Sequence, residues 1–265
     1  MQGLQGKVAI VTGGANGIGK AIMDRLCREG VSVTFGDMSD EGVAVQQECS
    51  ARGNSAHFVR GDLAEESFCR RLVDEAVARW GKLNYLVNNA FSFIAKGADA
   101  TREDWQRMLN AGPVGYATMA ACAVGPMKQQ GGGAIVNISS ISAHIAQPNR
   151  WTYNAAKGAV NQLTRCMALD LAPLGIRVNA VSPGWIWTRE VEKAAHGDRA
   201  KWGPVWGKFH MLRRLGRTEE IAGPVAFLLS DDASFITAAE LVVDGGYLGL
   251  GPEGLGEAST FAGSS

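Results

Sequence analysis

The sequence has no excess of charge of either sign, because 26 lysines and arginines are matched by 26 aspartates and glutamates among its 265 residues. Proteins that bind nucleic acid or an anionic membrane surface usually carry a basic excess, so we expect neither partner. No apolar run reaches the roughly 18 residues that a membrane-spanning helix needs. Residues 1–7 show neither the charged nor the apolar region of a secretory signal, and we therefore expect a cytoplasmic protein.

Cysteine, histidine and proline are also scarce. The five cysteines are odd in number and include no Cys-x-x-Cys pair, and the four histidines show no ligand spacing. This pattern is typical of reduced thiols and predicts neither a disulfide framework nor a metal site. Eight prolines and 46% hydrophobic residues exclude a disordered or collagen-like chain.

Glycine, in contrast, is abundant. The chain has 34 glycines, whereas a typical usage of roughly 7% would give about 19. Because glycine in regular structure costs backbone entropy, the surplus needs a physical cause. Much of it is concentrated in residues 12–19, 131–133 and 245–246 and in the last 17 residues, which indicates specific turns and a tail rather than general looseness.

Apolar, β-branched segments alternate with amphipathic ones along the chain. We expect helices between strands at residues 7–12, 31–36, 56–60, 83–87, 134–138, 177–181 and 240–243. Continuously apolar strands that alternate with helices indicate a parallel sheet covered on both faces. We therefore predict an α/β protein with a Rossmann-like, doubly wound sheet of about seven parallel strands in a single catalytic domain, residues 1–250.

Two segments fall outside this alternation. Residues 185–215 lack a regular periodicity and are rich in Trp, Arg and Gly, so we expect an irregular substrate lid there. Residues 251–265 are expected to form a loose, Gly-rich C-terminal tail, to which the sequence assigns no role.

A glycine-rich segment, TGGANGIG at 12–19, joins the first expected strand to the first expected helix. Glycines allow such a turn to pass close to a pyrophosphate, and the N-terminus of the following helix offers free N–H groups and a positive dipole end. The usual dinucleotide fingerprint is G-x-G-x-x-G, whereas the spacing here is G-x-x-x-G-x-G. A purely structural turn is the alternative for this motif taken by itself.

Asp37 follows the second expected strand, 18 residues after Gly19. This is close to the roughly 20 residues at which a carboxylate binds the adenosine ribose hydroxyls in dinucleotide-binding folds. No Lys or Arg occupies positions 14–16 or 38, so no side chain there would pair with a 2′-phosphate. We therefore predict NAD(H) rather than NADP(H) as the cofactor, with loop capping as the alternative role of Asp37.

Tyr153 and Lys157 form an i, i+4 pair in a helical segment, which places both side chains on one helix face. A nearby ammonium lowers the pKa of a phenol from about 10 and makes it usable as an acid or base near neutral pH. Ser140 follows the expected strand 134–138, at the sheet edge where ligands bind, and its hydroxyl can hydrogen-bond a substrate oxygen. A Tyr-x-x-x-Lys pair alone is common by chance, so the inference depends on the combination.

Together these motifs resemble those of the short-chain dehydrogenase/reductase family over about residues 5–247. The shared motifs are the segment 12–19, Asp62, Asn88-Asn89-Ala90, Asn110, Ser140, Tyr153 with Lys157, Asn179 through Pro183-Gly184, and Asp244-Gly245-Gly246. The resemblance implies an NAD-dependent enzyme that transfers a hydride between nicotinamide and a secondary alcohol or ketone. It also implies a homotetramer in which helices at about 101–127 and 152–173 pack against their mates.

By this resemblance, Tyr153 is the general acid/base, Ser140 positions the substrate oxygen, and Lys157 lowers the tyrosine pKa and binds the cofactor ribose. Asn110 would carry a proton-relay water through its backbone in a distorted helix, and is the fourth expected catalytic residue. The expected cofactor-binding residues are Gly13, Asn16, Gly17, Ile18, Gly19, Asp37, Asp62, Leu63, Asn89, Ala90, Tyr153, Lys157, Pro183, Gly184, Ile186 and Thr188.

Three residues depart from the family pattern. Phe91 stands where the family usually has Gly after Asn-Asn-Ala, and we expect it to narrow the nicotinamide side of the pocket. Pro113 follows Asn110 inside the expected helix, where a proline removes an N–H and clashes with the preceding turn. Its distortion could either reinforce the family's kink or misplace the relay. Ala238 also replaces a glycine.

The substrate side is less defined. We predict that the substrate is bound by Ser140, Ser142, His144, Trp151, Tyr153 and Trp185. Aromatic faces with scattered polar groups suit a sugar, a polyol or a cyclic alcohol, and a subunit-interface role for the tryptophans is an equal alternative.

Two other functions stay open. One is a non-redox reaction on the same scaffold, such as dehydration or epimerisation, and the other is non-catalytic dinucleotide binding. The intact set of Ser140, Tyr153 and Lys157 favours an NAD-dependent oxidoreductase with a small alcohol or ketone as its partner.

Overall fold

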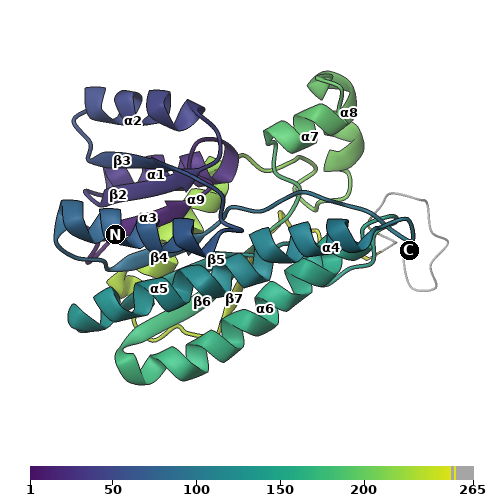
Figure 1. Cartoon of the computed structure of the whole chain (residues 1–265). Coiled ribbons are helices and arrows are strands. Elements are labelled where there is room, and N and C mark those ends of the chain that lie inside the picture. The colour runs from purple at the N-terminus through teal and green to yellow at the C-terminus, as the bar shows by residue number, and fades with distance from the viewer. Residues whose placement is uncertain (252–253, 255–265) are drawn as a thin grey trace.

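Seven parallel strands form one sheet in the order β3-β2-β1-β4-β5-β6-β7 in the computed structural model, which describes residues 1–251 and residue 254 (Figure 1). The strands are β1 (Val8–Thr12), β2 (Ser32–Asp37), β3 (Ala56–Arg60), β4 (Tyr85–Asn88), β5 (Gly133–Ile138), β6 (Ile176–Pro183) and β7 (Glu240–Val243). Each coincides with an expected strand, so the predicted Rossmann-like, single-domain sheet is confirmed. The buried β-branched residues of these strands explain the result, since both faces of the sheet are covered.

The helices cover the two faces of the sheet in two groups (Figure 1). One apolar core lies between the sheet and α1 (Gly17–Arg28), α2 (Glu41–Ala51) and α9 (Glu219–Leu229). A second core lies under α3 (Glu66–Trp80), α5 (Gly115–Gln129) and α6 (Trp151–Leu171). Between them the two cores bury residues of strands β1 to β6, while the edge strand β7 is only partly buried.

The chain adds β2 and β3 on one side of β1 and then returns to add β4 on its other side. The strand order therefore reverses between β1 and β4, which are neighbours in the sheet. Ligands of doubly wound sheets bind in the crevice at such a switch point, outside the carboxyl ends of the strands. The glycine-rich segment follows β1 and Asn89 follows β4, so both lie at this crevice.

The segment 185–215 is more ordered than expected. It contains two short helices, α7 (Arg189–Ala194) and α8 (Arg199–Gly207), which project beyond the sheet in Figure 1. Asp198 caps α8 by accepting the backbone N–H of Lys201 at 2.9 Å. Short helices of this kind give no long apolar periodicity, which is why the sequence predicted an irregular segment. The predicted tail lies, apart from residues 251 and 254, outside the described residues.

The helix expected from Thr101 onward is interrupted. Thr101 and Asp104 form a capping box at the start of α4 (Arg102–Leu109). A π-helical turn follows at Asn110–Val114 and leads into α5. Gly112 leaves helical geometry there, with φ −106° and ψ −116°, beside Pro113. The distortion expected from Pro113 is therefore present. None of the helices in the described part of the chain is long and apolar enough to cross a bilayer.

Candidate active site

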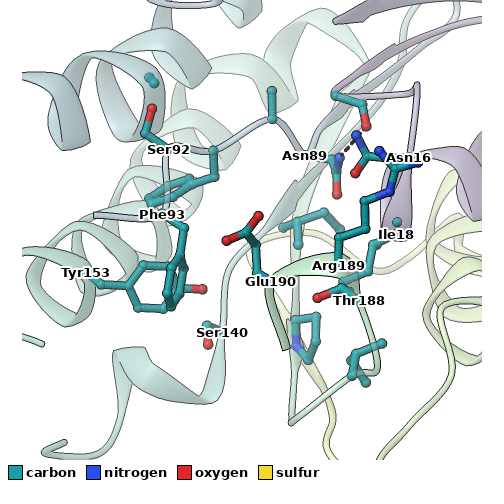
Figure 2. Close-up of a pocket in the computed structure, with 18 of the residues that line it drawn as sticks. Asn16, Ile18, Asn89, Ser92, Phe93, Ser140, Tyr153, Thr188, Arg189 and Glu190 are labelled. Carbon is teal, nitrogen blue, oxygen red and sulfur yellow. Dashed lines mark hydrogen bonds between the residues drawn. The ribbon is translucent and has the colours of Figure 1, made fainter. Parts of the chain in front are cut away.

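A cavity of about 760 Å³ follows the carboxyl edge of the sheet, between the glycine-rich segment and the 185–215 segment. In Figure 2, Asn16, Ile18, Thr188 and Arg189 lie on one side of the cavity, while Phe93 and Tyr153 lie on the other. We call the part formed by residues 12–19, 37–39, 61–63 and 89–90 the cofactor wall. The part formed by Phe91, Phe93, Arg150, Tyr153 and Trp185 is called the substrate wall.

The cofactor wall presents an open helix N-terminus. Asn16 is the N-cap of α1, yet its side chain makes no capping hydrogen bond. The backbone N–H groups of the first helical turn thus keep the donor capacity and positive dipole end that suit a pyrophosphate. These residues fit the dinucleotide that the sequence predicts.

Asn89 connects β4 to the glycine-rich segment. Its side-chain amide donates to the carbonyls of Thr12 at 2.9 Å and Gly13 at 3.1 Å, while its backbone N–H donates to the Thr12 hydroxyl at 2.9 Å. Asn89 thereby fixes the position of the phosphate-binding turn relative to β4. Its expected place at the cofactor site is compatible with this supporting role.

Gly19 is the one expected cofactor residue that does not line the cavity. A Cβ at Gly19 would lie 1.9 Å from the Gly13 carbonyl oxygen. The glycine is required because the helix passes this close to the preceding turn, so it supports the site through packing rather than through contact. The other fifteen expected cofactor residues all border the cavity.

Asp37 ends β2 at the far end of the cofactor wall. Its carboxylate accepts the backbone N–H groups of Ala15 and Ser39, each at 3.0 Å. The loop-capping alternative is thus realised, and the side chain also borders the cavity. Because a carboxylate has about four acceptor sites, two backbone bonds leave capacity for ribose hydroxyls.

Ser140, Tyr153 and Lys157 meet at the carboxyl end of β5. Ser140 follows that strand in extended backbone, and its hydroxyl oxygen accepts the N–H of Ser142 at 3.1 Å. Tyr153 and Lys157 lie on the same face of α6, as their spacing predicts, and all three side chains border one cavity. The Lys157 ammonium donates to the Ile138 carbonyl at 2.8 Å and is 3% exposed.

Burial sets the pKa of both ionisable groups. It lowers the pKa of Lys157 to about 7, because the charged ammonium has lost its water. It also raises the pKa of Tyr153, and a hydrogen bond with Ser140 and the charge of Arg150 oppose that rise. The Lys157 ammonium lies 5.7 Å from the centroid of the Tyr153 ring, and the lowering of the tyrosine pKa by Lys157 that the resemblance implies stays a prediction.

Phe91, which stands where the family usually has glycine after Asn-Asn-Ala, is part of the substrate wall. Its ring centroid lies 3.6 Å from the Lys157 ammonium and 5.7 Å from the Tyr153 ring. A Cβ at Gly112 would lie 2.7 Å from the Phe91 ring, so the phenyl group occupies space that the missing side chain leaves. The unusual Phe91 and the kinked turn at Gly112 therefore fit one another sterically.

Asn110 does not reach the cavity. Its side chain is exposed, and at this turn the cavity is bordered by Ala111. The Asn110 backbone carbonyl, which was expected to bind a relay water, accepts the N–H of Gly115 in the π-helical turn. The structure thus keeps the distorted helix, and the relay role of the Asn110 backbone stays a prediction.

Two of the expected substrate residues also lie elsewhere. Trp151 is 59% exposed and points away from the cavity, because residues two apart on a helix face different sides and Tyr153 takes the inner one. His144 contacts Glu240 of β7 instead, with Nε2 and Oε1 2.6 Å apart. Ser140, Ser142, Tyr153 and Trp185 do border the cavity, as expected.

Phe93, Arg150 and Glu190 are among the side chains that border the cavity without having been predicted as site residues. The Phe93 ring packs against Tyr153, with centroids 4.9 Å apart. Trp185 continues the substrate wall into α8 by packing on Trp206 at 5.1 Å. Phe93 follows the noted departure at Phe91 by two residues, which is the one sequence signal that could have found it.

Comparisons with known proteins agree with this geometry. Residues 13–248 match a family model described as enoyl-(acyl carrier protein) reductase, which belongs to the short-chain dehydrogenases/reductases. Cyclopentanol dehydrogenase of Comamonas sp. (strain NCIMB 9872) is 40% identical over 91% of this chain and 96% of its own. Cis-4-hydroxycyclohexanecarboxylate dehydrogenase of Sinomonas cyclohexanicum is 39% identical, again over 91% and 96%.

A solved structure of 7α-hydroxysteroid dehydrogenase, complexed with NADH and 7-oxoglycochenodeoxycholic acid, is also similar. It has a TM-score of 0.86 and 33% identity, and the match covers 92% of this chain and 94% of that one. The chain therefore belongs to the short-chain dehydrogenase/reductase family, as an oxidoreductase of CH–OH groups that uses a nicotinamide dinucleotide.

Proposed function

We propose that the protein oxidises a cyclic secondary alcohol to its ketone with NAD, or reduces the ketone with NADH. The observation that carries this proposal is the placement of Ser140, Tyr153 and Lys157 between the open N-terminus of α1 and the aromatic substrate wall. The names of the similar dehydrogenases, which refer to cyclopentanol, a hydroxycyclohexane carboxylic acid and a hydroxysteroid, support a ring-shaped substrate. They include neutral and acidic compounds, so they leave the charge of the substrate open.

Each residue of the set has a distinct task in the oxidation. The dinucleotide, when bound, supplies the acceptor for the hydride of the carbinol carbon. The Tyr153 phenolate takes the proton of the substrate hydroxyl, and the Ser140 hydroxyl hydrogen-bonds the same oxygen as its charge changes. Lys157 binds a ribose hydroxyl with the N–H groups that the Ile138 carbonyl does not use.

Asp37 supports NAD(H) over NADP(H). Its carboxylate would bind ribose hydroxyls and would repel a 2′-phosphate at the same place. Arg60 is the cation near this end, because its Nε donates to the Met38 carbonyl at 3.3 Å, but its guanidinium pairs with Asp40 at 3.1 Å. A phosphate would have to displace that carboxylate.

The 185–215 segment is proposed as the lid over the substrate. Arg189 at the start of α7 pairs with Glu41 of α2 at 2.7 Å, so an ion pair links this segment to the helix that follows the cofactor-wall residues 37–39. Closure would exclude water from hydride transfer. We further propose the homotetramer of the family, which the exposed Leu169 of α6 supports, and sedimentation velocity tests it.

Initial rates of dinucleotide reduction test the proposed activity. Cyclopentanol, cyclohexanol, a hydroxysteroid and a linear polyol are offered with NAD and, separately, with NADP. We expect cyclic alcohols with NAD to give the highest kcat/KM. Product formation without net dinucleotide turnover would favour dehydration or epimerisation, and binding without any turnover would favour a non-catalytic protein.

A further inference from the structure

Arg150 is a cation of the substrate wall that pairs with no carboxylate in the described part of the chain. Arg150 immediately precedes α6, three residues before Tyr153, and its side chain borders the cavity. Its guanidinium carbon lies over the faces of two aromatic rings, 5.5 Å from the centroid of Phe93 and 5.7 Å from that of Trp185. Two rings from distant segments of the chain thus fix the position of this side chain.

The N–H groups of Arg150 have no acceptor among the residues that the structure describes. Within residues 1–251 and 254, no hydrogen bond or ion pair involves its guanidinium, although the residue is half-buried. The two cations of the 185–215 segment that border the cavity are both paired: Arg189 with Glu41 at 2.7 Å, and Lys193 with Glu190 at 2.8 Å. Arg150 therefore differs from its neighbours, since its five donors are left for a ligand.

The guanidinium lies close to the reacting end of the site. Arg150 and Tyr153 both pack on the Phe93 ring, at 5.5 Å and 4.9 Å from its centroid. The charge and the phenol ring therefore lie against the same aromatic ring, close enough for one ring-shaped substrate to contact both. A substrate whose hydroxyl meets Tyr153 can thus present a substituent on its far side to Arg150.

We propose that Arg150 determines specificity by binding the carboxylate of a cyclic hydroxy acid while the hydroxyl of the same molecule meets Tyr153. This inference rests on the proposed function and names the substrate class within it. The planar guanidinium fork matches a carboxylate and forms two parallel, charge-assisted hydrogen bonds with it.

Glu190 is the acidic side chain nearest to this part of the cavity. Figure 2 shows its carboxylate directed into the cavity between Asn89 and Tyr153. Its Oε1 lies 2.8 Å from the Lys193 ammonium, so its charge is balanced within α7 and does not take the place of the substrate anion on Arg150.

Matched substrates test the proposal. Cis-4-hydroxycyclohexanecarboxylate and its primary amide have nearly the same shape, but only the first carries a charge. We expect the wild-type protein to use the carboxylate with the higher kcat/KM. Arg150→Met retains an apolar chain on the two rings and should lower kcat/KM for the carboxylate about 10- to 100-fold more than for the amide, mainly through KM. Arg150→Lys should retain part of the preference.

Arg189→Met is the matched control, because it removes a cation of the same cavity that already has a partner. It should change the carboxylate-to-amide ratio by less than about twofold. The proposal would be overturned if Arg150→Met lowered kcat/KM for the carboxylate and the amide by the same factor. It would also be overturned if the wild-type protein had the same kcat/KM for both. Thermal unfolding of each variant shows that it is folded.

Failure of the proposed function gives a different result. If neither substrate nor any neutral cyclic alcohol reduces NAD, the oxidoreductase proposal fails. If neutral alcohols are oxidised and the carboxylate has no advantage, the role of Arg150 alone is refuted.

Discussion

The cofactor wall and the substrate wall face the same cavity but are built differently. The cofactor wall consists of turns that directly follow β1, β2, β3 and β4. Hydrogen bonds from the side chains of Asn89 and Asp37 to backbone groups connect these turns. The substrate wall consists of side chains from three distant segments that meet through ring contacts. The first wall follows from local sequence and sheet topology, whereas the second exists only after tertiary packing.

This difference predicts how each wall responds to substitution. A change in the cofactor wall should alter the rate with every alcohol by the same factor, because all of them share one dinucleotide. A change in the substrate wall should alter the ranking of alcohols. Tyr153 and Lys157 lie where the walls meet and should affect all substrates most strongly.

The largest effect is expected for Tyr153→Phe. Loss of the acid/base should lower kcat by about 10²- to 10⁴-fold in both directions, while NADH binding, measured by its fluorescence, changes little. In the wild-type protein kcat/KM for oxidation should fall as pH decreases, because oxidation needs the phenolate. For reduction it should fall as pH increases, because reduction needs the phenol. Wild-type turnover in Tyr153→Phe would exclude Tyr153 as the acid/base.

Lys157→Met should reduce kcat on the order of 10²-fold for all alcohols. It should also stabilise the protein near neutral pH, since burial lowers the pKa of Lys157 to about 7 from 10.5. Between these values the unfolded chain binds more protons, so wild-type stability rises with pH across that window. The gain in unfolding free energy, on the order of a few kcal/mol at pH 7, should shrink by pH 10.

Denaturant unfolding of Lys157→Met and the wild-type protein at both pH values measures this gain. A Lys157→Met protein that is less stable than the wild type at pH 7 would show that the contacts with Ile138 and Phe91 outweigh the desolvation of the ammonium.

Asp37→Ala should lower kcat/KM for NAD about 10- to 100-fold, because a hydrogen bond to a charged group contributes about 1.5–3 kcal/mol. The factor should be the same for cyclopentanol and cyclohexanol, and the preference for NAD over NADP should decrease. An unchanged preference would reduce Asp37 to its loop-capping role. If the decrease in kcat/KM differed between the two alcohols, the cofactor wall would also influence substrate choice, contrary to the distinction drawn between the two walls.

Gly112→Ala tests the fit between Phe91 and the kinked turn. The added methyl group would lie 2.7 Å from the Phe91 ring and should destabilise the protein by about 1–3 kcal/mol. Phe91→Leu should recover part of this loss in the double variant. Additive losses in a double-mutant cycle would show that the two residues do not interact.

The smallest effects are expected for Trp151→Ala and His144→Ala, which should change kcat/KM by less than about twofold. Both residues lie outside the cavity, although the sequence suggested substrate contact. A large, substrate-dependent effect of either would place it in the substrate wall after all.

The sequence predicted the sheet, the dinucleotide motif and the Ser140, Tyr153 and Lys157 set because each depends on local spacing. Apolar strands, a turn after β1 and an i, i+4 pair on α6 keep their geometry in any protein of this fold. Short α7 and α8 were missed, since one or two turns give no clear period.

Side-chain direction at element ends was the other source of error. Trp151 was expected in the site and Arg150 was not, although one residue separates them. Because α6 begins at Trp151, the helix turns this side chain outward, while Arg150 still points to the cavity. The relay role of Asn110 stays a prediction, because its backbone carbonyl accepts one N–H in the π-helical turn and a carbonyl oxygen can accept two.

Isotope transfer tests the central claim most directly. Cyclohexanol deuterated at the carbinol carbon is incubated with NAD and the wild-type protein, and the NADH and ketone formed are measured. The account predicts equimolar ketone and NADH, with the deuterium in the dihydronicotinamide ring and a slower rate than with unlabelled alcohol. Deuterium released to water, or product without labelled NADH, would contradict it.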